Sequence, residues 1–244
     1  MFFLIPAITV YTIVFGTLSV FSSVVDRSGR FAHRCARGWS RLILVTTGVR
    51  VDVRGLEQLT PGTTYVFVSN HQSIYDIPVV FWALPFQLRI IAKQSLGSFP
   101  FLGWHLRRTG HLLVDRSRPD RSAILQRWRE LLGEGLSLII FPEGTRSEDG
   151  CVGRFKAGSF LLAMEAGLQI VPVSITGTRF VMRKGFLTTR PGDVRLTVHA
   201  PVSTAGGPES PDTPAAIRLS EQVRAVVEAR VAAEDQGVGT WPSN

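Results

Sequence analysis

The chain has 244 residues, of which 27 are lysine or arginine and 19 are aspartate or glutamate, so its formal charge is +8. This length is enough for one sizeable core. The basic balance fits nucleic acid, anionic lipid or a phosphorylated substrate and does not choose among them. Cys35 and Cys151 are the two cysteines and form no CxxC pair, which argues against a disulfide framework or a structural zinc site.

Residues 1–25 contain no charged side chain. As a helix they would span about 37 Å, more than the roughly 30 Å hydrocarbon core of a bilayer. A secretory signal peptide would have a basic start and a small-residue cleavage site, whereas this segment starts MFFLIP and offers no clear A-x-A. We therefore expect a membrane helix, with a cleaved signal or a buried core helix as the alternatives.

Residues 30–46 read as an amphipathic helix. Apolar side chains fall within an arc of about 120°, and arginines fall within about 60° on the opposite side. The apolar arc holds Phe31, Cys35, Trp39, Leu42, Ile43 and Thr46, and the basic arc holds Arg30, Arg34, Arg37 and Arg41. This pattern is typical of a helix lying in a membrane interface, although a surface helix packed on its own domain shows it too.

Arginines follow the first apolar segment and none precedes it. The positive-inside rule then places the rest of the chain in the cytoplasm. The first helix either spans the membrane or forms a hairpin with the second in one leaflet, and the sequence leaves both open.

From residue 49 onward, strand-like apolar runs alternate with helical stretches. We expect strands at 51–55, 64–70, 88–93, 111–115, 136–141, 169–175 and 194–200, and helices near 76–84, 120–133, 156–166 and 215–233. This alternation predicts an α/β fold with a largely parallel (mixed) sheet of about seven strands covered by helices. The chain then divides into membrane-associating helices over 1–48, an α/β domain over 49–235 and a flexible tail over 236–244.

The first chemical motif is NHQSIYD, which follows the strand at 64–70. In a loop turning into a helix, Asp76 can accept a hydrogen bond from Nδ1 of His71, which leaves Nε2 free to take a proton. Taken alone, the spacing also fits Asp76 as a mere cap of the following helix. No G-x-S-x-G nucleophile motif occurs in the chain, so the hydroxyl that His71 activates would belong to a substrate.

Two basic side chains, Lys93 and Arg116, lie at or just past expected strand ends. In parallel sheets, binding sites gather at these carboxyl ends. Lysine offers a point charge to phosphate and arginine a bidentate fork. The alternative is an ordinary solvated basic patch.

The motif FPEGTRS follows the apolar strand at 136–141. Pro142 and Gly144 are typical of a tight turn. Arg146 and the backbone N–H groups of the turn could hold a phosphate, and Glu143 could accept a hydrogen bond from a polyol hydroxyl. Pairing of Glu143 with Arg146 in solvent is the alternative. A fourth block, IVPVSITGT, contains Pro172, which suits an edge strand or a bulge.

Together these blocks resemble the lysophosphatidic acid acyltransferase (1-acyl-sn-glycerol-3-phosphate acyltransferase) family over roughly residues 65–200. The H-x₄-D motif of that family maps onto His71 and Asp76. Its phosphate-binding and substrate-binding positions map onto Lys93, Arg116, Phe141, Pro142, Glu143, Gly144, Thr145 and Arg146. In one departure, the common K-x-E-L is Lys93-Gln94-Ser95-Leu96 here.

The resemblance implies an α/β sandwich with an N-terminal two-helix membrane motif. It also implies transfer of a fatty acyl group from acyl-CoA or acyl-acyl carrier protein to the sn-2 hydroxyl of lysophosphatidic acid, which gives phosphatidic acid. Neither a cofactor nor a metal is implied, and the expected partners are a lysophospholipid, the thioester donor and the inner cell membrane rather than nucleic acid. Alternative acceptors are glycerol-3-phosphate or another lysolipid. A lipid hydrolase and a non-catalytic lipid-binding protein are the alternatives from other classes.

Overall fold

The computed structural model describes residues 4–26, 28–115, 121–204 and 213–235, and the expected tail at 236–244 lies outside them. Seven strands form one sheet, which confirms the expected α/β fold and the number of strands. The strands are β1 (Val49–Arg54), β2 (Val66–Ser69), β3 (Leu88–Lys93), β4 (Leu112–Val114), β5 (Ser137–Ile140), β6 (Ile170–Thr176) and β7 (Gly192–Val198).

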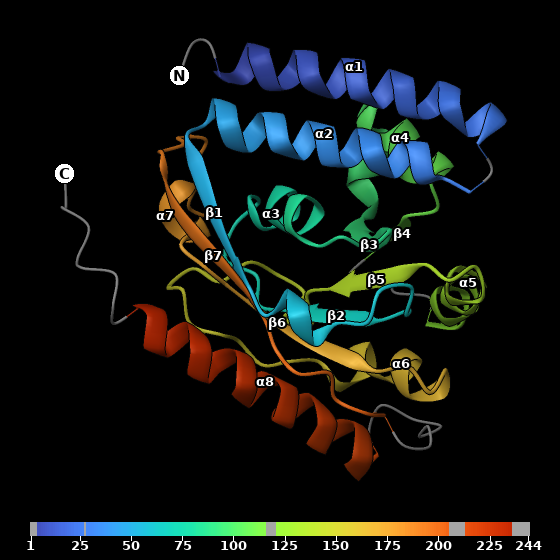
Figure 1. The fold of residues 1–244 in the computed structure, drawn as a ribbon, viewed down its shortest axis with the longest axis vertical. Coiled ribbons are helices and arrows are strands. Elements are labelled where there is room, and N and C mark those ends of the chain that lie inside the picture. The colour runs from blue at the N-terminus through green and yellow to red at the C-terminus, as the bar shows by residue number, and fades with distance from the viewer. Residues whose placement is uncertain (1–3, 27, 116–120, 205–212, 236–244) are drawn as a thin grey trace.

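Helices cover both faces of this sheet (Figure 1). They are α1 (Leu4–Val25), α2 (Arg30–Thr46), α3 (Asp76–Ala83), α4 (Leu102–Arg108), α5 (Arg121–Gly133), α6 (Leu161–Glu165), α7 (Thr178–Val181) and α8 (Pro214–Asp235). Figure 1 shows α1 and α2 stacked above the sheet and α8 and α6 on the opposite side. The buried apolar side chains accordingly form two clusters, one on each side.

The strand order is β1-β7-β6-β2-β5-β3-β4. Five of the six neighbouring pairs are parallel and only β6 and β7 are antiparallel. The sheet is therefore largely parallel but mixed, as expected. The carboxyl ends of β2, β3 and β5 lie at the same edge, because these strands run in the same direction as neighbours. Those predicted site residues that the structure describes lie at this edge.

Pro172 lies in β6, an interior strand, at a bulge in its pairing with the β7 segment. Val173 pairs with Val198, whereas Ile170 pairs with Val202. The partners are three residues apart on β6 and four apart on the other strand, so one extra residue is accommodated there. A proline has no N–H to donate to a ladder, and the bulge is where that missing donor is tolerated.

Three segments differ from the expected helices, and one of them is the four-residue α7, which was not expected. The helix expected at 156–166 is a 3-10 turn at Ala157–Ser159 followed by the short α6. Lys156 has extended backbone and its N–H donates to Pro142, so the start of the segment is tied to the preceding loop. The short α4 was not expected, because Gly103 interrupts the pattern. A Cβ at Gly103 would lie 2.2 Å from the carbonyl oxygen of Gly97, so a close approach requires glycine there.

The amphipathic helix α2 packs between α1 and α3. Arg37 donates to the main-chain oxygens of Leu84 and Trp82 at 3.0 and 3.1 Å. Cys35 and Ile43 from the apolar arc are buried in the protein. Part of the apolar arc and part of the basic arc of α2 therefore pack against the rest of the protein. The exposed residues of α2 are the ones that a membrane interface could still contact.

Helix α1 has one packed side and one exposed apolar side. Gly16 and Ser19 are buried, and the Ser19 hydroxyl lies 2.6 Å from Nδ1 of His105 in α4. Only 11% of the most apolar 18-residue stretch of α1 is buried, and its length and composition are sufficient to cross a membrane. The exposed side chains include Ile5, Val10, Val14, Leu18, Phe21, Val24 and Val25.

Candidate active site

His71 and Asp76 form a hydrogen-bonded pair where the chain leaves β2 and enters α3. His71 Nδ1 lies 2.6 Å from Asp76 Oδ2. The same oxygen accepts the backbone N–H groups of Gln72 and Ser73 at 2.8 and 2.9 Å, and Oδ1 accepts the Thr178 hydroxyl at 2.5 Å. Asp76 is fully buried, so these four donors replace the water that an exposed carboxylate would bind.

This geometry fixes the tautomer of the His71 ring. An ionised carboxylate is only an acceptor, so Nδ1 carries the proton and Nε2 is left as a proton acceptor. The carboxylate of Asp76 bonds to N–H groups that precede α3, and this is not the geometry of a helix cap. The pair therefore has the arrangement of a general base and the residue that orients it.

Phe141 and Glu143, from the loop after β5, hold His71 from two sides. The rings of His71 and Phe141 stack with centroids 4.3 Å apart. Glu143 Oε1 accepts the His71 backbone N–H at 2.7 Å, and Oε2 accepts that of Gly153 at 3.0 Å. Burial raises the pKa of the Glu143 carboxyl, and these two backbone bonds oppose that shift. We expected Glu143 to meet a substrate hydroxyl, but the structure gives each of its oxygens a backbone amide.

Gly144 makes the tight turn that FPEGTRS predicts. Its φ is 75°, in the left-handed region, and its N–H donates to the Phe141 carbonyl at 3.0 Å. A Cβ at this position would lie 2.7 Å from Nζ of Lys156. Glycine is thus favoured by the backbone conformation, and the amine of Lys156 lies over the turn.

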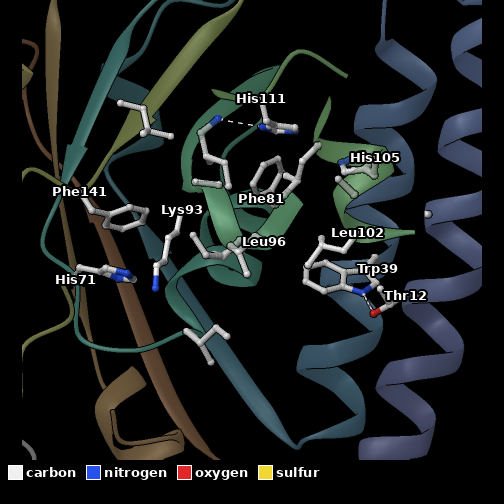
Figure 2. A pocket seen from close by; sticks show the side chains of 18 of the residues that line it. Thr12, Trp39, His71, Phe81, Lys93, Leu96, Leu102, His105, His111 and Phe141 are labelled. Atoms are coloured by element: carbon white, nitrogen blue, oxygen red, sulfur yellow. Dashed lines mark hydrogen bonds between the residues drawn. The ribbon is translucent and has the colours of Figure 1, made fainter. Parts of the chain in front are cut away.

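A cavity of about 390 Å³ extends from His71 to residues of α1 and α2. Figure 2 shows the side chains of His71 and Lys93 pointing into one end of it, and Trp39 and Thr12 at another. The walls are mostly apolar, and a long apolar space beside a proton acceptor suits a hydrocarbon chain. The apolar lining includes Phe15, Trp39, Ile74, Ile77, Phe81, Ile91, Leu96, Leu102 and Phe141.

Two further histidines, His105 and His111, line this cavity away from His71 (Figure 2). Burial lowers the pKa of His105 to about 4 and takes the pKa of His111 well below its ordinary value. His111 Nδ1 accepts the N–H of Ile90 at 3.1 Å. Burial therefore keeps both of these rings in the neutral form near pH 7.

Three of the predicted substrate-binding residues lie beside His71. Lys93 is exposed at the end of β3, and Thr145 and Arg146 follow the glycine turn, all three lining the cavity. Arg146 is half-buried, and within the described residues it has neither an ion pair nor a hydrogen bond. Two cations, Lys93 and Arg146, are thus available to an anionic group near Nε2 of His71.

The other predicted residues are placed differently. Glu143 and Gly144 line a second cavity of about 1180 Å³ rather than the first. Arg116 lies outside the described residues. Across the described segments, no group of three His, Cys, Asp or Glu side chains is placed to hold a metal ion.

The structure also reveals two supporting residues that the sequence analysis did not single out. The Asn70 side chain bonds to both the N–H and the C=O of Ile175, each at 2.8 Å. It extends the β2–β6 pairing and so fixes where the loop carrying His71 begins. Thr178 donates to Asp76 from 102 positions away in the chain. Bonds between residues so far apart in sequence leave no local pattern. In the sequence analysis Thr178 appeared as the last residue of the block IVPVSITGT, with no role assigned to it.

Comparison with known proteins gives a consistent result. A family model described as acyltransferase matches residues 50–176. A chloroplast 1-acyl-sn-glycerol-3-phosphate acyltransferase of Brassica napus is 37% identical over 189 residues, which is 75% of this chain and 54% of that protein. The 1-acyl-sn-glycerol-3-phosphate acyltransferase of Pseudomonas aeruginosa is 30% identical over 207 residues, 81% of this chain and 78% of that protein. The chain spans about half the length of the plant relatives that it matches.

A solved structure is similar over almost the whole chain. The 1-acyl-sn-glycerophosphate acyltransferase of Thermotoga maritima aligns with a TM-score of 0.76 and 28% identity, and the alignment covers 97% of each chain. The likeness therefore includes the N-terminal helices as well as the α/β sheet.

Proposed function

Because this chain belongs to the 1-acyl-sn-glycerol-3-phosphate acyltransferase family, we propose that it transfers a fatty acyl group from a thioester to the sn-2 hydroxyl of lysophosphatidic acid. The product is phosphatidic acid. The observation that carries the proposal is the oriented base: His71 has its Nδ1 held by buried Asp76 and its ring at the mouth of an apolar cavity. Lys93 and Arg146 at the same mouth supply cations for the phosphate of the acceptor.

The proposed step needs no covalent enzyme intermediate. Nε2 of His71 takes the proton of the acceptor hydroxyl as its oxygen attacks the thioester carbonyl carbon. A C–O bond forms, the C–S bond breaks, and the proton held by His71 passes to the leaving sulfur. Asp76 stabilises the imidazolium that exists between these two proton transfers.

The apolar cavity fits the acyl chain of the donor. Its walls are mostly apolar, and each methylene buried there contributes roughly 0.8 kcal/mol to binding. With the chain in the cavity, the thioester carbonyl lies near His71 at its mouth. Much of the acceleration would come from holding both reactants in this geometry.

The N-terminal helices support an attachment to one leaflet rather than a crossing. Helix α2 packs against α1 and exposes Arg34 and Arg41, so a crossing pair would carry arginines into the hydrocarbon, where charge is costly. Exposed apolar side chains cover the outer side of α1, and Trp104 of α4 is also exposed. A hairpin dipped into the cytoplasmic leaflet of the inner membrane satisfies both observations. The apolar cavity of the protein would then lie beneath the cytoplasmic leaflet and open towards a lipid acceptor in it.

Identification of the lipid product tests the proposed function. Purified full-length protein in detergent is incubated with lysophosphatidic acid and palmitoyl-CoA or palmitoyl-acyl carrier protein, and the lipids are analysed by mass spectrometry. We expect phosphatidic acid with the new chain at sn-2. Release of free palmitate without phosphatidic acid would identify a hydrolase, and acylation of glycerol-3-phosphate or another lysolipid in preference to lysophosphatidic acid would correct the acceptor.

A further inference from the structure

The second cavity, of about 1180 Å³, meets the first at a shared wall. Four residues line both cavities: Ile91, Phe141, Thr145 and Arg146. The second cavity takes its other walls from β4, β5, α5, α6, α8 and the loop at 141–159, and no residue of α1 or α2 borders it. It therefore lies next to the reacting centre but away from the membrane-facing helices.

The rim of this second cavity carries two exposed cations that are free of ion pairs within the described residues. Arg154 and Lys156 are exposed there, and neither has an ionic partner within the described residues. The acidic groups of the rim already have partners: Glu143 accepts two backbone amides, Glu148 pairs with a lysine and Asp149 accepts bonds within its own turn. Arg154 and Lys156 are thus the rim cations available to a phosphate, whereas the carboxylates of the rim are engaged elsewhere.

The shape of the donor relates the two cavities. Its apolar chain fills the first cavity and its thioester lies at His71, so the part beyond the sulfur continues past the shared wall at Phe141 and Arg146. In both natural donors this part is a pantetheine arm, which carries two amides and ends in a phosphate. An apolar wall with a cationic rim matches that arm. A lysophospholipid would instead enter from the bilayer, on the side of α1 and α2.

We propose that the second cavity binds the 4′-phosphopantetheine arm of the acyl donor and that Arg154 and Lys156 hold its phosphate. This inference rests on the proposed acyl transfer and extends it to a donor site. Lys156 has a particular place in it, because its amine lies over the Gly144 turn beside the shared wall. It would tie the donor phosphate to the loop that also positions His71.

The test compares two minimal donors that differ only in the phosphate: palmitoyl-4′-phosphopantetheine and palmitoyl-pantetheine. Phosphatidic acid formation by the full chain in detergent gives kcat/KM for each, with lysophosphatidic acid as the acceptor. We expect the wild-type enzyme to prefer the phosphorylated donor by about tenfold, and Arg154→Gln or Lys156→Gln each to lower that preference about threefold or more. Neither variant should change kcat/KM for the unphosphorylated donor as much, nor the KM for lysophosphatidic acid.

Arg218→Gln is the matched control, because Arg218 is an exposed arginine of α8 that borders neither cavity. It should leave the preference unchanged. Because the readout is a ratio, a variant that damages the fold lowers kcat/KM for both donors equally and leaves the ratio unchanged. An unchanged ratio in both rim variants overturns the proposal, and so does a rise in the KM for lysophosphatidic acid in place of the donor effect.

Palmitoyl-CoA and palmitoyl-acyl carrier protein distinguish the sources of the arm. If the shared phosphate is what the rim binds, both variants lose efficiency with both donors. A loss confined to palmitoyl-CoA would assign the rim to the nucleotide, and one confined to the carrier protein would assign it to that protein's surface; either result overturns the proposal. Wild-type protein that forms no phosphatidic acid with any of the four donors would contradict the proposed function itself, and the inference with it.

Discussion

Replacement of Asp76 by asparagine separates the charge of this residue from its shape. Asp76 is fully buried, one of its oxygens accepts three N–H donors and the other accepts the Thr178 hydroxyl. An asparagine can keep its oxygen on the three N–H groups and turn its amide towards Thr178, whose hydroxyl is able to accept. With the amide turned towards the three N–H groups instead, these buried donors would be unpaired at a cost of about 1–3 kcal/mol each. The first orientation is therefore more stable, and the loop keeps its structure.

What the Asp76→Asn variant loses is the negative charge beside the imidazolium. Hydrogen bonds to an ionised acceptor are roughly twice as strong as neutral ones, and the neutral amide no longer enforces the tautomer of His71. We expect kcat to fall by about 10²–10⁴, the range ascribed to a positioned base, with a Tm lowered by only a few degrees. Combination with His71→Ala should give no further loss, because the two residues act as one unit.

Asp193→Asn is the control for this experiment. Asp193 forms an exposed ion pair with Arg50, and such pairs contribute little to stability, so both kcat and Tm should stay near the wild-type values. An Asp76→Asn protein that folds and retains near-normal kcat would refute the reasoning and return Asp76 to a purely structural role.

Three further predictions concern binding, attachment and the loop that holds the base. Arg146→Lys keeps the charge but loses the bidentate fork, so the KM for lysophosphatidic acid should rise more than that for the donor, and a selective donor effect would move Arg146 to the donor site. A chain that begins at Val49 should leave the membrane fraction or aggregate, whereas the full chain should resist a high-salt wash; release of the full chain by salt alone would exclude an apolar anchor. Glu143→Gln loses one of two backbone acceptors, which should lower kcat about tenfold and reduce Tm; an unaffected variant would show that this contact does not position His71.

Much of the fold was predictable because the central strands are largely apolar and the strands are separated by turn residues. Val66–Ser69 and Ser137–Ile140 are buried on both faces, which a continuous apolar run indicates directly. The antiparallel pairing of β7 with β6 was not predictable, since strand direction depends on the path of the connection and not on composition. The short α4 was not predicted, because seven residues that include a glycine are too few to show a helical period.

The site was predictable where its residues are close in sequence. His71 and Asp76 are five positions apart, so a turn alone brings them together. Glu143 lies 72 positions from His71, and its bond to the His71 backbone depends on β2 and β5 being neighbours. From its chemistry alone Glu143 was expected to meet a substrate hydroxyl, and that contact stays a prediction; the structure adds the bond to the His71 backbone. The FPEGTRS motif forms part of the wall of the second cavity, but its other walls come from separate elements, and the sequence does not show that they enclose a cavity.

The turnover of His71→Ala tests the central claim most directly. The variant should reach the membrane and show the wild-type Tm within a few degrees, because among the described residues the His71 side chain donates a single hydrogen bond, to Asp76. Formation of phosphatidic acid from lysophosphatidic acid and palmitoyl-CoA is then measured at saturating concentrations of both. The account predicts that kcat falls by at least about 10²–10⁴. A folded His71→Ala protein that turns over at a near-normal rate would contradict it.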